Sequence, residues 1–340
     1  MKKLFLSIIA GLTAVATYAQ NSLLATLSHE GEISTYYGAV ALRDAYNAAS
    51  HGDIITLSSG TFLATNIEKA VTIRGAGMMP DTVNNILPTI LSGDFTINIP
   101  DSIESSRLTM EGLYHNHTIN ISNLNNATFL KNRLAKVTYS TNGSRLRNLT
   151  FIHCFVTSGF YLPEESSASC INSYIHGATS RSGESSNFEF TNCVIINHDP
   201  LLIDIKTSMF VNCLVYSTYG YSDYDLIHGS CSAYNCVGRT KHGYALFSNI
   251  PNTTNTQLSG ELSTLFKTYD GTYNDNETFE LTDEAKTKYL GSDGTQVGIY
   301  GGNLPFSVTP TNPQITKCNV AAKSTADGKL SVDIQVSAAE

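Results

Sequence analysis

The chain has 340 residues, with 21 lysine and arginine residues against 29 aspartate and glutamate residues and a formal net charge of −8. This acidic balance disfavours nucleic acid as a partner, because nucleic-acid binding depends on basic patches. Beyond the N-terminal region no segment approaches the run of about 20 apolar residues that a transmembrane helix needs, so we predict no membrane span.

The N-terminus has the organisation of a secretory signal peptide. Lys2 and Lys3 precede an apolar run from Leu4 to Val15, and small residues lead to Ala19. A basic start, a short apolar centre and a small-residue end are typical of a cleaved leader. We therefore predict a signal peptide over 1–19 and a secreted chain, located in the periplasm, at the cell surface or in the medium.

The next region, 20–52, is expected to form an N-terminal cap with one amphipathic helix. Between Gly38 and Ser50 the apolar residues recur at helical spacing, and those expected on one side are Val40, Leu42, Ala45, Tyr46 and Ala49. A β-solenoid exposes strand edges and core at its open end, so a covering helix suits this place in the chain.

Residues 53–250 contain a repeat of about 20 residues, which decides the fold class. Equivalent positions of successive repeats hold Gly112, Asn132, His153, Asn172, Asn192, Asn212 and Asn235. The residues around each position are apolar or small at the spacing expected for two short strands that flank a bend. Because one coil cannot bury its apolar face alone, coils must stack. We predict an all-β, single-stranded, right-handed parallel β-helix.

Stacking also explains the repeated asparagines and cysteines. Asparagine tolerates the left-handed backbone of a bend, and its amide is expected to hydrogen-bond to the asparagine of the next coil. Cys154, Cys193, Cys213 and Cys236 share one inward row, where a thiol serves as a small apolar filler. We expect free thiols, because parallel Cβ directions in stacked coils make the disulfide torsion unfavourable.

The repeat is lost after residue 250. We expect irregular loops and the last coils over 251–305. Within 306–340, two alternating segments, Gln314 to Ala321 and Lys329 to Ala338, flank Asp327-Gly328 and predict a β-hairpin that forms a C-terminal cap or tail. We expect a single domain and a monomer.

The start of the solenoid resembles the pectin lyase-like superfamily. The resemblance is carried by Ala39 to Phe62, a helix that leads into Gly-Asp, an apolar strand, glycine and an aromatic residue, and by the strand Val71 to Gly77 with its glycine turn. It covers two thirds of the exported chain and implies a substrate that lies in a lateral groove beside one of the parallel sheets.

The catalytic sets that this resemblance implies are incomplete. Polygalacturonase-like members carry His-Gly and Arg-x-Lys, and this chain has His176-Gly177, His228-Gly229 and Arg239-Thr240-Lys241. It lacks the Asp-Asp pair and the Asn-Thr-Asp strand of those enzymes. No carboxylate pattern at the spacing of a pectate lyase-like calcium site stands out.

The repeat places several polar residues on one lateral edge, because residues at equal distance from the bend lie above one another. Candidate catalytic residues are Lys241, Arg239 and His198, of which a lysine or arginine is suited to take the proton beside a uronate carboxylate. Candidate calcium ligands are Asp199, Asp204, Asp223 and Asp225. Candidate carbohydrate-binding residues are Tyr216, Tyr219, Tyr221, Tyr224, His176 and His198, since a tyrosine ring offers a flat apolar face to a sugar.

These features predict a secreted or surface-associated β-helix protein that binds polysaccharide along a lateral groove without catalysis. Two alternatives stay open at this point. One is a polysaccharide lyase or glycoside hydrolase that acts on uronate-containing glycans. The other is a structural or adhesive solenoid. We expect no cofactor, and calcium is the one that the candidate aspartates leave open.

Overall fold

The computed structural model describes the chain from residue 23 onward, with gaps. The residues that it does not describe are 1–22, 84–85, 100–106, 142, 181–186, 198–206, 218–230, 244–245, 248–249, 251–253, 259–261, 312, 321–322, 325–326, 330 and 338–340. The predicted signal peptide, 1–19, lies outside the described residues. Within them, no helix has the length and apolar character needed to cross a membrane.

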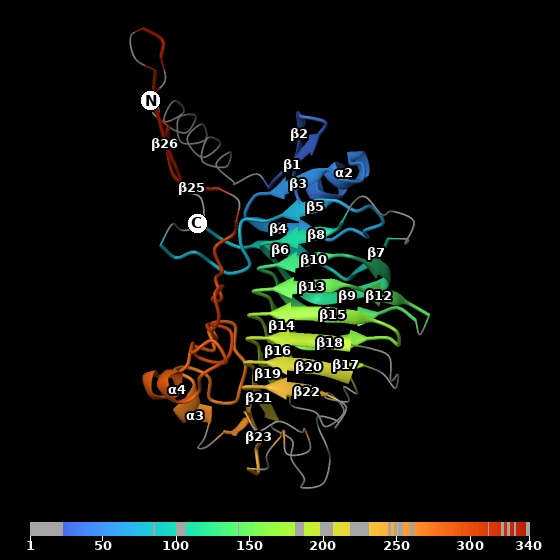
Figure 1. The fold of residues 1–340 in the computed structure, drawn as a ribbon. Coiled ribbons are helices and arrows are strands. Elements are labelled where there is room, and N and C mark those ends of the chain that lie inside the picture. The colour runs from blue at the N-terminus through green and yellow to red at the C-terminus, as the bar shows by residue number, and fades with distance from the viewer. Residues whose placement is uncertain are drawn as a thin grey trace, which may run out of the picture.

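The described strands stack into a right-handed parallel β-helix of about 7 turns, as predicted (Figure 1). Sheet A has eleven strands, in the order β2 (Glu32–Tyr37), β1 (Leu24–His29), β3 (Ile54–Leu57), β5 (Thr72–Arg74), β8 (Thr109–Glu111), β10 (Thr128–Leu130), β13 (Leu149–Ile152), β15 (Ser167–Ile171), β18 (Asn187–Thr191), β20 (Thr207–Val211) and β22 (Ser232–Tyr234).

Among the described residues, sheet B has thirteen strands, several of which are longer than those of sheet A. Its order is β24 (Thr256–Gln257), β23 (Val237–Thr240), β21 (Leu214–Ser217), β19 (Val194–Asn197), β16 (Tyr174–His176), β14 (Phe155–Leu162), β11 (Arg133–Tyr139), β9 (Leu113–Asn125), β6 (Thr89–Ser92) and β4 (Gly60–Leu63), with β7 (Phe95–Asn98), β12 (Arg145–Arg147) and β17 (Ala178–Ser180) paired to β9 or β14. The long strands β9, β11 and β14 give the coils that contain them a broad outer surface.

Helix α2 (Ala41–Ala48) covers the N-terminal end, and its buried residues include Leu42, Ala45 and Tyr46. The Tyr46 hydroxyl accepts hydrogen bonds from the backbone N–H groups of Glu68 and Lys69, which joins the helix to the next coil. The sequence pattern did not reveal β1 and β2. They form an antiparallel hairpin that extends sheet A beyond its first parallel strand.

Aromatic side chains fill the interior in register. The inward row of sheet A holds Met110, Phe129, Phe151, Cys170, Phe190, Phe210 and Ala233. Along it the rings of Phe129 and Phe151 stack with centroids 4.6 Å apart, and those of Phe190 and Phe210 stack at 5.2 Å. Stacking like residues on like residues thus buries one continuous core.

The bends between sheets A and B have a left-handed residue in every coil from β8 to β22. The residues with positive φ at this bend are Gly112, Lys131, His153, Asn172, Asn192, Asn212 and Asn235. The prediction was therefore wrong by one residue in the second coil, where Lys131 and not Asn132 occupies the bend. This shift turns the Asn132 side chain inward, where it bonds to the Met110 carbonyl, and the Arg133 side chain outward, toward Tyr114 and Asp275.

In several coils the inward residue that follows the bend donates a side-chain hydrogen bond to a carbonyl of the coil before it. Asn132 Nδ2 donates to the Met110 carbonyl at 2.7 Å, and the thiols of Cys193 and Cys213 donate to carbonyls at 3.2 and 3.4 Å. The predicted inward cysteines are confirmed as buried free thiols, and burial raises the pKa of Cys154 to about 12. They are more than apolar filler, since the thiols of Cys154, Cys193 and Cys213 also donate hydrogen bonds to carbonyls of the preceding coil.

After the last coil the chain turns back along the outside of the solenoid. We call residues 262–289 the cover and residues 290–311 the strap. The cover includes helices α3 (Leu262–Leu265) and α4 (Asp283–Lys288), which lie in a region expected to be irregular. Its buried residues Phe266, Tyr269 and Phe279 belong to a second hydrophobic cluster, together with the outward residues of sheet B.

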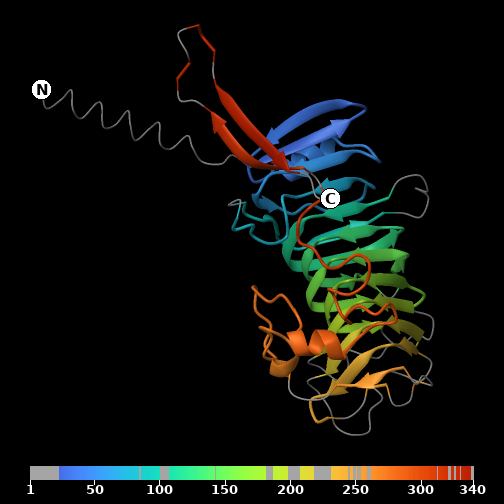
Figure 2. The ribbon, with the colours of Figure 1, turned by 60° about the vertical axis from the view of Figure 1, so that its left-hand side comes forward.

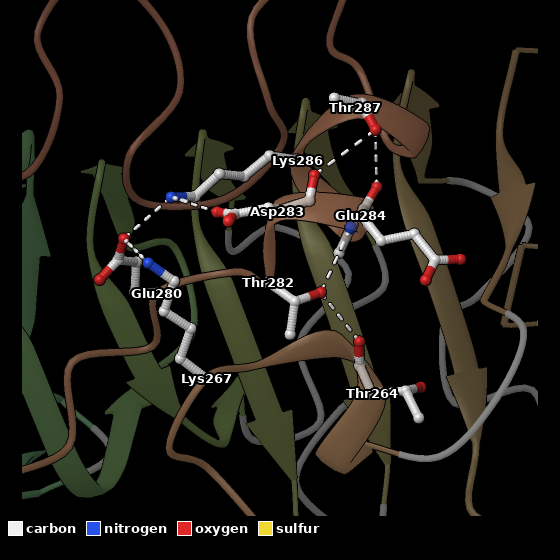
Figure 3. A network of polar contacts seen from close by, with 9 residues as sticks. Thr264, Lys267, Glu280, Thr282, Asp283, Glu284, Lys286 and Thr287 are labelled. Carbon is white, nitrogen blue, oxygen red and sulfur yellow. Dashed lines mark hydrogen bonds and ion pairs between the residues drawn. The ribbon is translucent and has the colours of Figure 1, made fainter.

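Polar contacts hold the cover in shape (Figure 3). The Glu280 carboxylate accepts hydrogen bonds from Lys267 Nζ at 2.7 Å and from Lys286 Nζ at 2.8 Å, and these bonds lower the pKa of Glu280. Thr282 caps α4 by accepting from the Ala285 N–H, and its hydroxyl donates to the Thr264 carbonyl in α3. The two short helices are thereby tied together.

The strap climbs from the C-terminal coil toward the N-terminal end and is held by the bend residues or their neighbours (Figure 2). Successive contacts join Asn212 to Ser292, Asn172 to Ile299 and Gly301, His153 to Leu304, Lys131 to Thr309, and Glu111 to Thr311. The expectation that these asparagines bond to one another is corrected, because their amides reach the strap instead. An asparagine pair between coils does form at another bend, where Asn148 donates to Asn126 at 3.1 Å.

Beyond the strap, β25 (Gln314–Val320) and β26 (Val332–Ser337) form the predicted antiparallel hairpin. It is a separate two-stranded sheet and pairs with none of the described strands of sheets A and B.

Replacement of Asn172 by alanine should loosen the strap. The change removes two hydrogen bonds from a buried amide and places alanine at a φ of 44°. We expect a loss of about 1–3 kcal/mol in the free energy of unfolding, measured by urea denaturation, and faster proteolysis within the strap. Asn172→Gly removes the same bonds without the backbone strain, so its free energy of unfolding should lie between those of the wild type and Asn172→Ala. Two variants as stable as the wild type would contradict the role of the amide.

Candidate functional site

The predicted edge residues occupy one row of sheet B. His176 pairs with Ile196, Ile196 with Tyr216, and Tyr216 with Arg239. With strands about 4.8 Å apart, His176 and Arg239 are separated by roughly 14 Å along this row. The register predicted from the repeat is thus confirmed, whereas a functional role for the row stays a prediction.

The cover lies over the middle of this row. Tyr216 is only 5% exposed and shares the second hydrophobic cluster with Phe266 and Tyr269. In this arrangement its ring packs beneath the cover and is not an open platform for a sugar. His176 is partly exposed, with Nδ1 3.4 Å from the Tyr174 hydroxyl.

The remaining predicted residues fall into two groups. Arg239 is partly exposed at the end of the row, and Lys241 is exposed just beyond β23. The others lie outside the described residues, and they are Tyr219, Tyr221, Tyr224, His198, Asp199, Asp204, Asp223 and Asp225. The predicted catalytic set and calcium site are therefore not assembled from described residues.

An arginine that contacts two aromatic rings links sheet B to the cover at Tyr273 and Asp275. The Arg133 guanidinium lies 4.8 Å from the centre of the Tyr114 ring and 5.7 Å from that of Tyr273, and it bonds to Asp275. Burial is the main cause that raises the pKa of Tyr273 to about 12. This contact holds the cover against the part of sheet B that is nearest to the bends.

Farther along the same strands, a tyrosine lies over a glycine on the outer surface. A Cβ atom added to Gly159 would fall 2.5 Å from the ring of Tyr161, so the ring occupies the space above this glycine. Lys136 Nζ lies 5.1 Å from the centre of the same ring. We call Tyr161, Gly159 and Lys136 the tyrosine platform. Both of its side chains are partly exposed.

Neutral polar residues surround the tyrosine platform. Thr118 pairs with Lys136, and Asn120 pairs with Thr138 on the adjacent strands. These residues come from the long strands β9 and β11. The platform therefore combines an aromatic ring, one ammonium group and nearby hydroxyl and amide groups.

The sequence repeat did not reveal this platform. A register shift between Leu134 and Lys136 breaks the pairing of β11 with both neighbours, so distances counted from the bend no longer identify equivalent residues. One local signal was present. Gly159 stands inside a strand two residues before Tyr161, and a glycine inside a strand marks a place where another group approaches closely.

Comparison with known proteins adds no relative to this picture, because no family model, curated protein or solved structure matches the chain. The architecture is consistent with a pectin lyase-like fold. Fold alone does not determine activity, so function must be argued from the surface chemistry.

The contact between Gly159 and Tyr161 can be tested with a double-mutant cycle. Gly159→Ala should lower the free energy of unfolding by about 1–3 kcal/mol, because the methyl group displaces the ring and the backbone φ of 139° is strained for alanine. Adding Tyr161→Ala should restore part of that loss by removing the clash. Denaturation of the four proteins gives the coupling energy. Strictly additive effects would show that the ring does not lie over Gly159.

Proposed function

We propose that this protein is a secreted, pectin lyase-like β-helix that binds acidic polysaccharide along the outer face of sheet B. The observation that carries the proposal is the tyrosine platform, in which Tyr161 lies against Gly159 with the Lys136 ammonium group over its ring. The ring offers its face to the C–H groups of a sugar, and the ammonium group offers a counter-charge to a uronate carboxylate. The signal-peptide pattern of residues 1–19 supports export.

Binding without cleavage is the activity that the residues support best. The sequence lacks the acid pairs of the polygalacturonase-like enzymes, and the platform presents a cation and an aromatic ring rather than two carboxylates. Glycosidic hydrolysis by such enzymes needs one acid to protonate the leaving group and a second to activate water or attack the sugar. Retention of the polymer at the surface needs neither.

The overall negative charge makes the position of Lys136 important. A polyanion is repelled by most of an acidic surface and approaches only where a local positive group outweighs that field. Binding through one lysine should therefore be moderate in strength and should weaken with added salt. Weakening of binding with added salt would therefore distinguish a uronate ligand from a neutral one.

Binding can be measured by microscale thermophoresis with polygalacturonate and alginate oligosaccharides at low salt. Tyr161→Ala should weaken binding at least tenfold, since stacking on an aromatic ring is lost. Lys136→Gln should weaken binding of uronate oligosaccharides and remove most of its salt dependence. The matched control is Tyr37→Ala, which removes a tyrosine that is 63% exposed on β2 and should leave binding unchanged.

Two results would overturn this proposal. One is unchanged affinity in Tyr161→Ala while the protein remains folded by circular dichroism. The other is the appearance of unsaturated uronate absorbance or of new reducing ends, which would show that the protein cleaves its ligand.

A further inference from the structure

The outer face of sheet A carries hydroxyl side chains at one register position in five consecutive strands. The pairs are Thr72 with Thr109, Thr109 with Thr128, Thr128 with Thr150, and Thr150 with Ser169. All five residues are partly exposed. Because parallel strands lie about 4.8 Å apart, the hydroxyl groups form a straight column with that repeat.

A second column, of aliphatic side chains, runs beside the first. Leu130, Ile152 and Ile171 pair in register on β10, β13 and β15, and each is partly exposed. The other outer positions of these three strands hold only threonine and serine, so this part of the face is uncharged although the chain has a net charge of −8. We call the two columns together the hydroxyl strip.

Strand formation alone does not require these hydroxyl groups. Threonine does favour strands, but the same register position continues with Glu189 on β18 and Met209 on β20, in the same sheet and at the same pitch. The strip ends where Ser169 donates a hydrogen bond to the Glu189 carboxylate at 3.1 Å. The five hydroxyl residues are thus a local feature of the coils from β5 to β15.

Within the part of the chain that the structure describes, no other element covers the strip. The cover packs on sheet B, and the strap follows the bends at the side of sheet A. In Figure 1 the strands of sheet A are stacked one below another, and no described element crosses in front of β10, β13 and β15. Within the described residues, the strip therefore presents a column of hydroxyl side chains beside a column of aliphatic ones.

We propose that the hydroxyl strip is a second binding surface, which takes the face of an ordered, uncharged polysaccharide. The surface of a fibre of parallel glycan chains repeats hydroxyl groups and C–H faces at regular intervals, as the strip does. The absence of charge at β10, β13 and β15 matches a neutral polymer, unlike Lys136 on the opposite sheet. This surface is independent of the tyrosine platform.

The rigidity of both partners favours a fibre over a single chain. The strip is held by the hydrogen bonds of the sheet, so its side chains lose little freedom on binding. A dissolved oligosaccharide must be ordered when it binds, whereas a chain within a fibre is already ordered. Each hydroxyl contact is weak, and the regular spacing lets several of them form at once.

The test is a co-sedimentation assay with microcrystalline cellulose and chitin, alongside soluble cello- and chito-oligosaccharides. The full-length protein should sediment with at least one fibre and bind the corresponding oligosaccharide at least tenfold more weakly. The double variant Thr128→Val/Thr150→Val keeps the side-chain shape and strand preference but removes two hydroxyl groups, and it should lower the fibre affinity at least fivefold. Thr128→Lys/Thr150→Lys should abolish sedimentation.

The control variants separate this surface from the tyrosine platform. Tyr161→Ala should leave fibre binding unchanged, and Thr128→Val/Thr150→Val should leave uronate binding unchanged. Wild-type protein that stays in solution with both fibres would overturn the inference, as would a valine variant that is folded and sediments like the wild type. Loss of uronate binding alone would count against the proposed function and not against the hydroxyl strip.

Discussion

The left-handed residue at the bend between sheets A and B determines the organisation of this molecule. A single residue with positive φ turns the chain from a strand of sheet A into a strand of sheet B, and it recurs from Gly112 to Asn235. The residue after the bend faces inward, whereas the side chain of the bend residue itself faces outward. Asparagine and glycine suit the bend because they tolerate this backbone, and Lys131 and His153 show that the stacked coils can impose it on other residues.

The inward and outward sides of the bend have separate structural roles. On the inside, asparagine, serine and cysteine side chains donate hydrogen bonds to carbonyls of the preceding coil, so that these polar groups are paired within an otherwise apolar core. On the outside, Asn172, His153 and Lys131 bind the backbone of the strap. The strap and cover therefore depend on the same repeat that builds the solenoid, although they do not themselves repeat.

The position of the cover decides which surfaces can meet a ligand. It buries the outward residues of sheet B nearest to the bends, Tyr174 and Tyr216 among them, and leaves the far halves of the long strands partly exposed. The tyrosine platform lies on those far halves, and the hydroxyl strip lies on the other sheet. One is cationic and aromatic and the other is uncharged, so the rigid scaffold presents two different chemistries.

The sequence alone determined the coil length, the bend, the inward cysteines, the cap helix and the terminal hairpin, because each depends on neighbours within one coil or on stacking of like on like. It also placed His176, Tyr216 and Arg239 in one row. It assigned one bend to Asn132, whereas Lys131 has the left-handed backbone there, because the stacked coils impose a conformation that lysine does not favour by itself. Only the tertiary structure decided that the cover buries Tyr216 and that Tyr161 lies over Gly159. The first depends on contacts with a segment distant in the chain, and the second on a register shift that the repeat does not encode.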